Sequence, residues 1–342
     1  MIRFDDILGQ SAAVEFLRAA CLADRLPHAM IFAGSVGVGK RTCATALAGW
    51  FLCPNARGDK ACGKCDSCRL IPTGNHPDLH IVAKELIRFH DKTGKSKGIN
   101  LSIDVVRPEL IEPAARTAAM GHGKFFIIEQ ADLMSDAAQN ALLKTLEEPA
   151  GRTAIVLLTD APESLLPTVR SRCQIVRFAS LDTKAVQARL EKQGIDSATA
   201  ADAAELSEGS LGGAMNLISE GLIPRARELE MQIEQLFAGH APADLAGWLK
   251  HAADQHAETE LERDPLGSKE SATRAGLNLY LSFAARWLRV RLRQTADADQ
   301  LEQTCRAIDA MSRFQMYLDA NVNVPLALGQ LAAAWDAEFA AR

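Results

Sequence analysis

The sequence lacks the excess of basic residues that is typical of chains that bind nucleic acid on their own. It has 38 Lys and Arg against 43 Asp and Glu, which gives a formal net charge of −5 at pH 7. A self-sufficient nucleic-acid-binding domain usually carries a clear basic excess. We therefore expect any contact with DNA to come from a local patch or from a complex.

The sequence also lacks long apolar segments. No run of 18 or more apolar residues occurs, so no transmembrane helix is predicted. The start of the chain turns acidic at Asp5 and Asp6 and has no apolar segment of the kind found in signal peptides. Eight cysteines without a secretory signal favour thiols or metal ligands in a reducing compartment. We expect a cytoplasmic protein that does not contact membranes.

The length and the hydrophobic pattern predict an α/β architecture of two or three domains. A chain of 342 residues with 48% hydrophobic and 24% charged residues is typical of soluble globular proteins. Short apolar runs predict strands at 28–33, 79–82, 125–128, 154–158 and 175–178. Helical patterns lie between them at 41–51, 105–120, 136–146 and 164–170. This alternation favours a mostly parallel sheet.

Beyond residue 178 the strand signals stop. The pattern predicts an α/β domain at 1–180, a small helical domain at 181–220 and a helical domain at 225–342. Gly and Pro at 221–224 predict a break between helices, and a second, polar break is expected at 264–268. The segment 90–98 has no periodicity and predicts an exposed, mobile loop.

A glycine-rich loop at 34–40 follows the first predicted strand and precedes a predicted helix. Glycines let backbone N–H groups surround a phosphate, and Lys40 adds a positive charge. The candidate nucleotide-binding residues are Gly34, Gly37, Gly39, Lys40, Arg41 and Thr42. The alternative is a glycine-rich turn without a ligand, and the strand–loop–helix context favours phosphate binding.

Two residue types at this site argue against hydrolysis. Arg41 occupies the position where a Ser or Thr hydroxyl usually holds magnesium, and Thr42 is rotated by about 100° along the helix. Glu129 and Gln130 end the third predicted strand, and Gln130 cannot take a proton from water. Asp132 lies two residues further on. An ordinary strand end with polar residues explains this second pattern equally well.

Four cysteines lie close together in the sequence. Cys53, Cys62, Cys65 and Cys68 have the spacing C-x8-C-x2-C-x2-C, and four thiolates without an open position suit structural zinc. An iron–sulfur cluster is the alternative, because soft thiolates accept either. The other four cysteines are isolated, and we expect each to be a small buried residue.

Two arginine patterns have less specific meanings. Ser171-Arg172-Cys173 follows the predicted helix at 164–170, and an arginine at a subunit edge can act on the γ-phosphate of a neighbour's nucleotide. Taken alone, Arg172 is better explained as a surface loop residue. Arg286, Arg289 and Arg293 at helical spacing could contact DNA or an acidic partner, but a solvated helix face is the favoured interpretation.

With these residues identified, the chain resembles the delta-prime subunits of bacterial DNA polymerase III clamp loaders, a family within the AAA+ superfamily. The resemblance covers residues 1–220 and rests on the motifs at 4–10, 26–29, 74–78, 140–149 and 165–173 together with the four cysteines. It implies a nucleotide-binding-like module with a zinc knuckle, a helical lid and a helical collar for oligomerisation. It also implies delta and gamma/tau subunits as partners, and sliding clamp and primed DNA reached through the complex.

Departures from the active subunits of that family favour one subunit type. At the positions that match 41, 129–130 and 212, active subunits resemble one another in having Ser or Thr, Asp-Glu, and an arginine that senses the γ-phosphate. This chain has Arg41, Glu129-Gln130 and Gly212 instead. The resemblance implies that Arg172 is retained as an arginine finger acting in trans. We therefore expect a subunit of a replication complex. If it binds ATP, we expect hydrolysis to be inefficient. It would be associated with a DNA polymerase without having a polymerase site of its own.

Two rival functions stay open from the sequence. An active gamma/tau-type ATPase would need Glu129 to hold magnesium and another carboxylate, such as Asp132, to act as base. A self-sufficient zinc-dependent DNA-binding module is disfavoured by the net charge of −5.

Overall fold

A computed structural model of the chain describes residues 2–90, 100–240, 244–263, 268–320 and 322–339. The chain divides into two compact units, Met1–Asn216 and Leu217–Arg342, which are described separately below. The three domain boundaries expected from the sequence stay predictions.

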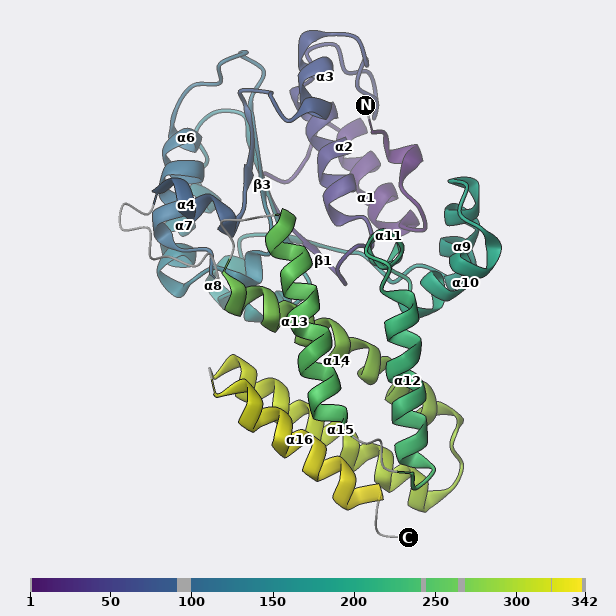
Figure 1. Ribbon diagram of the computed structural model, residues 1–342. Helices are drawn as coiled ribbons and strands as arrows, with labels where there is room; N and C mark the ends of the chain where they lie inside the picture. The colour runs from purple at the N-terminus through teal and green to yellow at the C-terminus, as the bar shows by residue number, and fades with distance from the viewer. Residues whose placement is uncertain (1, 91–99, 241–243, 264–267, 321, 340–342) are drawn as a thin grey trace. The chain divides into compact units, whose positions relative to one another are not determined.

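Among the described residues, the first unit contains five strands in one parallel sheet (Figure 1). They are β1 (Ala29–Ala33), β2 (Leu79–Val82), β3 (Lys124–Ile128), β4 (Thr153–Thr159) and β5 (Gln174–Arg177). The order across the sheet is β2-β3-β4-β1-β5, and all four pairings are parallel. Every predicted strand is confirmed to within one residue at each end.

The sheet is covered by helices on both faces, which explains why its central strands are continuous apolar runs. All residues of β1, β3 and β4 are buried. Successive side chains of β1 point to opposite faces: Phe32 joins a core with α1 and α2, whereas Ile31 joins a core with α5 and α7. Figure 1 shows α1 and α2 on one side of the strands and α6 and α7 on the other.

The remaining elements of the first unit are mostly short. Its α-helices are α1 (Ser11–Leu22), α2 (Lys40–Leu52), α3 (Asp66–Leu70), α4 (Ile87–His90), α5 (Ile103–Val106), α6 (Glu112–Ala115), α7 (Asp136–Glu147), α8 (Pro167–Arg170), α9 (Thr183–Lys192), α10 (Ser197–Leu206) and the start of α11 (Leu211–Ser219). Single 3₁₀ turns are η1 (Phe4–Asp6), η2 (Ile71–Thr73), η3 (Lys84–Leu86), η5 (Ala131–Leu133) and η6 (Pro162–Ser164), and η4 (Arg107–Ile111) is a π-turn.

The single helix predicted at 105–120 is wrong. The segment is broken into α5, η4 and α6, and it leaves the helix at Arg116, which is extended. Pro108 and Pro113 lack the N–H groups that a regular helix needs. Beyond them, the buried carboxylate of Asp78 accepts hydrogen bonds from the backbone N–H groups of Ala119 and Met120 at 2.6 and 2.8 Å. The carboxylate of a distant residue therefore accepts the hydrogen bonds from N–H groups that would bond to backbone carbonyls in a continuing helix.

The helix predicted at 164–170 is shortened for a local reason. Only α8 forms there, because Leu165 and Leu166 are extended. The ring of Pro167 disfavours helical backbone at the residue before it.

The second unit is helical throughout its described residues, as the sequence predicts. After the end of α11, it consists of α12 (Ile223–Phe237), α13 (Leu245–Arg263), α14 (Lys269–Gln294), α15 (Ala298–Asp319) and α16 (Val324–Phe339). α14 packs against α12, α13 and α15, and α16 packs against α15. The predicted break between helices is confirmed, but it lies at 220–222, because α12 already begins at Ile223 and includes Pro224 in its first turn.

Two other predicted breaks fall outside the described residues. These are the loop at 90–98 and the polar break at 264–268, apart from His90 at the end of α4 and Ser268 before α14. Their predicted conformations are not tested by the structure.

The basic stripe predicted on α14 is not a uniform solvated face. The side chain of Arg286 is 7% exposed and forms an ion pair with buried Glu230 of α12. Arg291 lies over the ring of Phe237, with its guanidinium carbon 4.7 Å from the ring centroid. Arg289 and Arg293 are exposed. The expected solvation is therefore wrong for Arg286, which holds α14 to α12.

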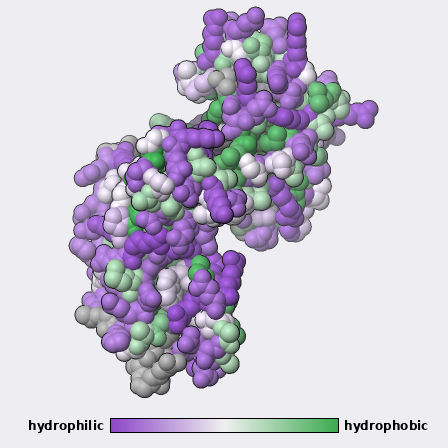
Figure 2. Space-filling view, turned by 90° about the vertical axis from the view of Figure 1, so that its right-hand side faces the viewer, coloured by the Kyte–Doolittle hydropathy of each residue, from purple (hydrophilic) through white to green (hydrophobic). Residues whose placement is uncertain are grey.

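The surface of the molecule is mainly hydrophilic in the view of Figure 2, and its hydrophobic residues gather mostly in the upper part of that view. None of the helices in the described ranges is long and apolar enough to span a membrane.

Candidate nucleotide and metal sites

The glycine-rich loop leaves the carboxyl end of β1 and leads directly into α2. Gly34 has φ +155°, and a Cβ there would lie 2.2 Å from the carbonyl oxygen of Phe178. Gly37 and Gly39 also have positive φ, at +76° and +104°. Glycine is the residue that adopts such angles without strain. The sequence therefore folds the loop tightly around the N-terminus of α2, where backbone N–H groups favour an anion.

The loop lines a pocket of about 680 Å³. Five of the six predicted nucleotide-binding residues line this pocket: Gly37, Gly39, Lys40, Arg41 and Thr42. Gly34 does not line it and packs instead against Phe178. Charged residues that the sequence analysis did not assign also line it: Asp6, Glu85, Asp160 and Arg189. They come from segments far apart in the chain, so no local spacing could have grouped them.

Lys40 is folded back onto its own loop. Its Nζ donates to the backbone carbonyl of Ser35 at 2.8 Å and to that of Gly34. Burial lowers the pKa of the Lys40 ammonium, and the nearby carboxylates of Asp160 and Asp132 oppose this shift. A bound phosphate would have to draw Lys40 away from these carbonyls.

Arg41 is paired with the acidic residue at the end of β3. Its Nη1 lies 2.8 Å from Oε1 of Glu129, whose side chain is 22% exposed. Burial raises the pKa of the Glu129 carboxyl, while the positive charge of Arg41 lowers it. The guanidinium thus compensates the negative charge of this partly buried carboxylate.

Further polar residues lie around this pair. Gln130 lines the pocket and has a left-handed backbone, with φ +48°. Its amide is not a base. Thr159 lies at the end of β4, and its hydroxyl accepts a hydrogen bond from the N–H of Ala161 at 3.0 Å. Asp132, the alternative base, also lines the pocket.

The start of α11 closes onto the loop through a backbone hydrogen bond. The N–H of Gly212 donates to the carbonyl of Gly37 at 3.0 Å. A Cβ on Gly212 would lie 2.9 Å from the Cα of Gly37, so neither glycine leaves room for a side chain. Ser210 stabilises this turn by accepting a hydrogen bond from the N–H of Gly213 at 2.8 Å.

Gln10 ties the loop to the segment that follows β5, the edge strand next to β1. Its buried amide donates to the carbonyls of Val38 and Ala179, at 3.1 and 2.7 Å, and accepts from the N–H of Ala179 at 3.1 Å. The sequence analysis used Gln10 only as part of a motif. A polar residue directly before an amphipathic helix gave no other signal of this role.

The four clustered cysteines lie together, from Cys53 at the end of α2 to Cys68 within α3. Their sulfur atoms are all within 4.8 Å of one another, with Cys53 to Cys65 at 3.8 Å and Cys62 to Cys68 at 3.9 Å. Four sulfurs at about 2.3 Å from a tetrahedral ion lie about 3.8 Å apart. The arrangement therefore fits a four-coordinate metal ion.

The protein environment favours the thiolate at one of the four cysteines and disfavours it at two others. The backbone N–H groups of Lys64 and Cys65 donate to Cys62 and lower the pKa of its thiol to about 6. Burial raises the pKa of Cys53 and Cys68. A bound cation would offset that burial, because it stabilises the deprotonated form.

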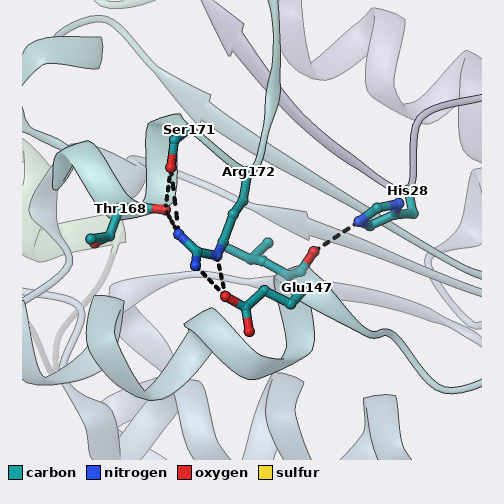
Figure 3. Close-up of polar contacts among 6 residues, drawn as sticks. His28, Glu147, Thr168, Ser171 and Arg172 are labelled. Carbon is teal, nitrogen blue, oxygen red and sulfur yellow. Dashed lines mark hydrogen bonds and ion pairs between the residues drawn. The ribbon is translucent and has the colours of Figure 1, made fainter.

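Arg172 lies at the surface of the first unit, directly after α8 (Figure 3). Its guanidinium is bound to the carboxylate of Glu147 at the end of α7 and donates to the carbonyl of Thr168 at 2.9 Å. Its side chain is 34% exposed. The guanidinium is therefore held in place but remains accessible from outside the chain.

The comparison with known proteins agrees with this geometry. The family model described as "DNA polymerase III, delta subunit" matches residues 9–182, which is more than half of the chain and includes the loop, the cysteines and Arg172. The chain belongs to this DNA polymerase III subunit family.

Individual members of this subunit family are similar over part of their length. The chain is 37% identical over 187 residues to the DNA polymerase III subunit delta' of Bacillus subtilis, covering 54% of this chain and 52% of the relative. It is 31% identical over 209 residues to subunit tau of the same organism, covering 61% and 34%. The chain thus spans about half or less of these two relatives.

A solved structure of a DNA polymerase III gamma subunit-related protein from Thermotoga maritima is also similar. It has a TM-score of 0.43 and 18% identity, and the match covers 95% of this chain and 98% of that chain.

The tight contact at Gly37 generates a stability prediction. A Cβ at Gly37 would lie 2.2 Å from Ser210 Oγ and 2.8 Å from the N–H nitrogen of Gly213, whereas one at Gly39 would meet nothing within 4 Å. Both substitutions place alanine at a positive φ, which costs about 1–2 kcal/mol. We expect Gly37→Ala to cost about 1–3 kcal/mol more than Gly39→Ala because of the overlap. Urea unfolding of the two variants checks this, and equal losses would contradict the contact.

Proposed function

We propose that this chain is a clamp-loader subunit that completes a neighbour's ATP site and has little ATPase activity of its own. Membership of the DNA polymerase III subunit family supports a role in a replication complex. The observation that carries the specific role is the Arg41–Glu129 ion pair, because the two positions expected to hold magnesium are bound to each other.

Nucleotide binding without efficient turnover fits the pocket. The loop N–H groups and Lys40 can receive phosphates, and Arg41 can supply positive charge in place of magnesium. Hydrolysis additionally requires an oriented water and a base, and Gln130 cannot act as one. ATP is therefore proposed as a bound ligand whose conversion is slow.

Arg172 is proposed as the arginine finger that acts on ATP held by an adjacent subunit. Such a residue must reach the surface, carry a permanent charge and be oriented. Exposure of Arg172 and its contacts with Glu147 and Thr168 support each requirement. The carboxylate of Glu147 would then hold the guanidinium in position until the neighbour's γ-phosphate takes the place of this carboxylate.

The proposed partners follow from the family. They are delta and gamma/tau subunits in a shared ring, with the sliding clamp and primed DNA engaged through the complex in the cytoplasm. Polymerisation itself is assigned to other subunits of the polymerase III holoenzyme. The net charge of −5 supports contact with DNA through the complex.

The cysteine cluster is proposed to hold structural zinc. Its four thiols leave no open coordination position for chemistry. The same module is connected to its surroundings, because Nε1 of Trp50 donates to the carbonyl of Gly58 at 2.8 Å and Arg18 pairs with Asp59 at 3.2 Å. Zinc would therefore stabilise the segment next to α1 and α2.

ATP turnover by the isolated chain tests the main proposal. We expect nucleotide binding to be detectable with or without magnesium and phosphate release to be at background. An active gamma/tau-type ATPase is the second candidate, favoured by the position of Asp132 on the pocket wall. Turnover that disappears in both Lys40→Ala and Asp132→Asn would establish that candidate instead.

Arg172→Ala tests the action in trans. In a clamp loader reconstituted with partner subunits, we expect this variant to lower ATPase and clamp loading by about 10³-fold or more at the affected site, with assembly unchanged. Arg170→Ala, two residues earlier on α8, is the matched control and should have little effect. Normal turnover with Arg172→Ala would remove the arginine-finger role.

Metal analysis tests the zinc site. We expect one tightly held zinc per chain, lost in Cys68→Ser together with a decrease of about 5 °C or more in the unfolding temperature of the first unit. Cys305→Ser is the control, because Cys305 is isolated and is exposed, where the sequence predicted a buried residue. Iron with visible absorbance would identify an iron–sulfur cluster, and a metal-free protein of unchanged stability would contradict any metal role.

A further inference from the structure

A second group of metal-binding side chains lies in the helical unit, far in sequence from the cysteines. Glu220 follows α11, and His256 and Glu260 lie on α13. One donor atom from each of the three residues lies within 4.8 Å of the others. Neither the family nor the proposed function uses these residues.

The fold brings the donor atoms of the three side chains close together. His256 and Glu260 are four residues apart, so they project from the same face of α13. Nδ1 of His256 lies 3.8 Å from Oε2 of Glu220. Two ligands at 2.0–2.1 Å from a tetrahedral ion lie about 3.3 Å apart, so a small movement brings both into coordination range.

The neighbouring helix fixes the position of the histidine. A Cβ on Gly276 of α14 would lie 3.1 Å from the Cβ of His256 and 3.0 Å from the Cα of Ala253. α14 therefore packs closely against α13 at this level. The side chains of Glu220 and His256 are only 14% and 11% exposed, so two of the three donors are largely shielded from water.

A positive charge already lies between the two carboxylates. Nη1 of Arg263 is 2.9 Å from Oε1 of Glu220 and 3.3 Å from Oε1 of Glu260. The carboxylates thus converge on one cation. The Arg263 side chain is 49% exposed and can turn into solvent when another cation takes this position.

We propose that Glu220, His256 and Glu260 form a binding site for a divalent ion of the zinc type, for which Arg263 is the substitute cation. One imidazole nitrogen and two carboxylate oxygens suit zinc with one position left for water. Magnesium and calcium prefer oxygen ligands in larger number. Because Glu220 precedes α12 and the other ligands belong to α13, the ion would hold the entry to α12 against α13.

The site is tested by titrating Zn²⁺ into the full chain after its tightly bound metal is saturated and excess ion is removed. Calorimetry should then show one further, weaker zinc per chain. We expect His256→Ala and Glu260→Gln each to weaken this binding at least tenfold. His251→Ala, which removes an exposed histidine of the same helix, should leave it unchanged.

Arg263→Gln separates a metal site from a simple ion-pair network. If Arg263 competes with the ion, its replacement should strengthen zinc binding several-fold and make the unfolding temperature of the helical unit more dependent on zinc. Glu260→Gln, at a side chain that is 42% exposed, keeps the test valid if His256→Ala does not fold. Zinc binding that is equal in wild type, Glu260→Gln and Arg263→Gln would overturn the proposal.

Discussion

The parallel pairing of β1 with β4 and β5 is the constraint on which the nucleotide-binding region depends. Parallel strands bring their carboxyl ends to one edge, so the loop after β1 lies beside the residues that follow β3, β4 and β5. Gly34 passes so close to Phe178 that only glycine fits, and Gln10 ties Val38 to Ala179. The sheet therefore assembles a pocket of the shape that a phosphate loop requires, whether or not its side chains can carry out hydrolysis.

Within this framework, the polar and charged groups of the loop satisfy one another or their neighbours. Arg41 neutralises Glu129, Lys40 binds the carbonyls of its own loop, and Gly212 donates to Gly37. These contacts are made within the chain. The Arg41–Glu129 pair is the most consequential of them, since a partly buried carboxylate without a counter-charge would be costly.

Local patterns in the sequence were enough to predict the strands, the phosphate-loop geometry and the cysteine cluster. Each depends on neighbouring residues: continuous apolar runs, glycines between a strand and a helix, and two C-x2-C steps. The failures have distant causes. The carboxylate of Asp78 binds the backbone of Ala119, 41 residues away, where a continuing helix was predicted. Glu230 forms an ion pair with Arg286, 56 residues away, where a solvated side chain was predicted. The pairing of Arg41 with Glu129 was likewise hidden, although both residues had been singled out separately.

The backbone contact between Gly37 and Gly212 has a consequence for how such a subunit can change over evolutionary time. The two glycines exclude a side chain from each other, so their effects on fitness cannot be independent. An arginine introduced at position 212 to sense the γ-phosphate would first collide with the Cα of Gly37. A larger side chain at position 212 therefore requires the loop to move, so a substitution there becomes tolerable only after a second change that opens the contact with Gly37.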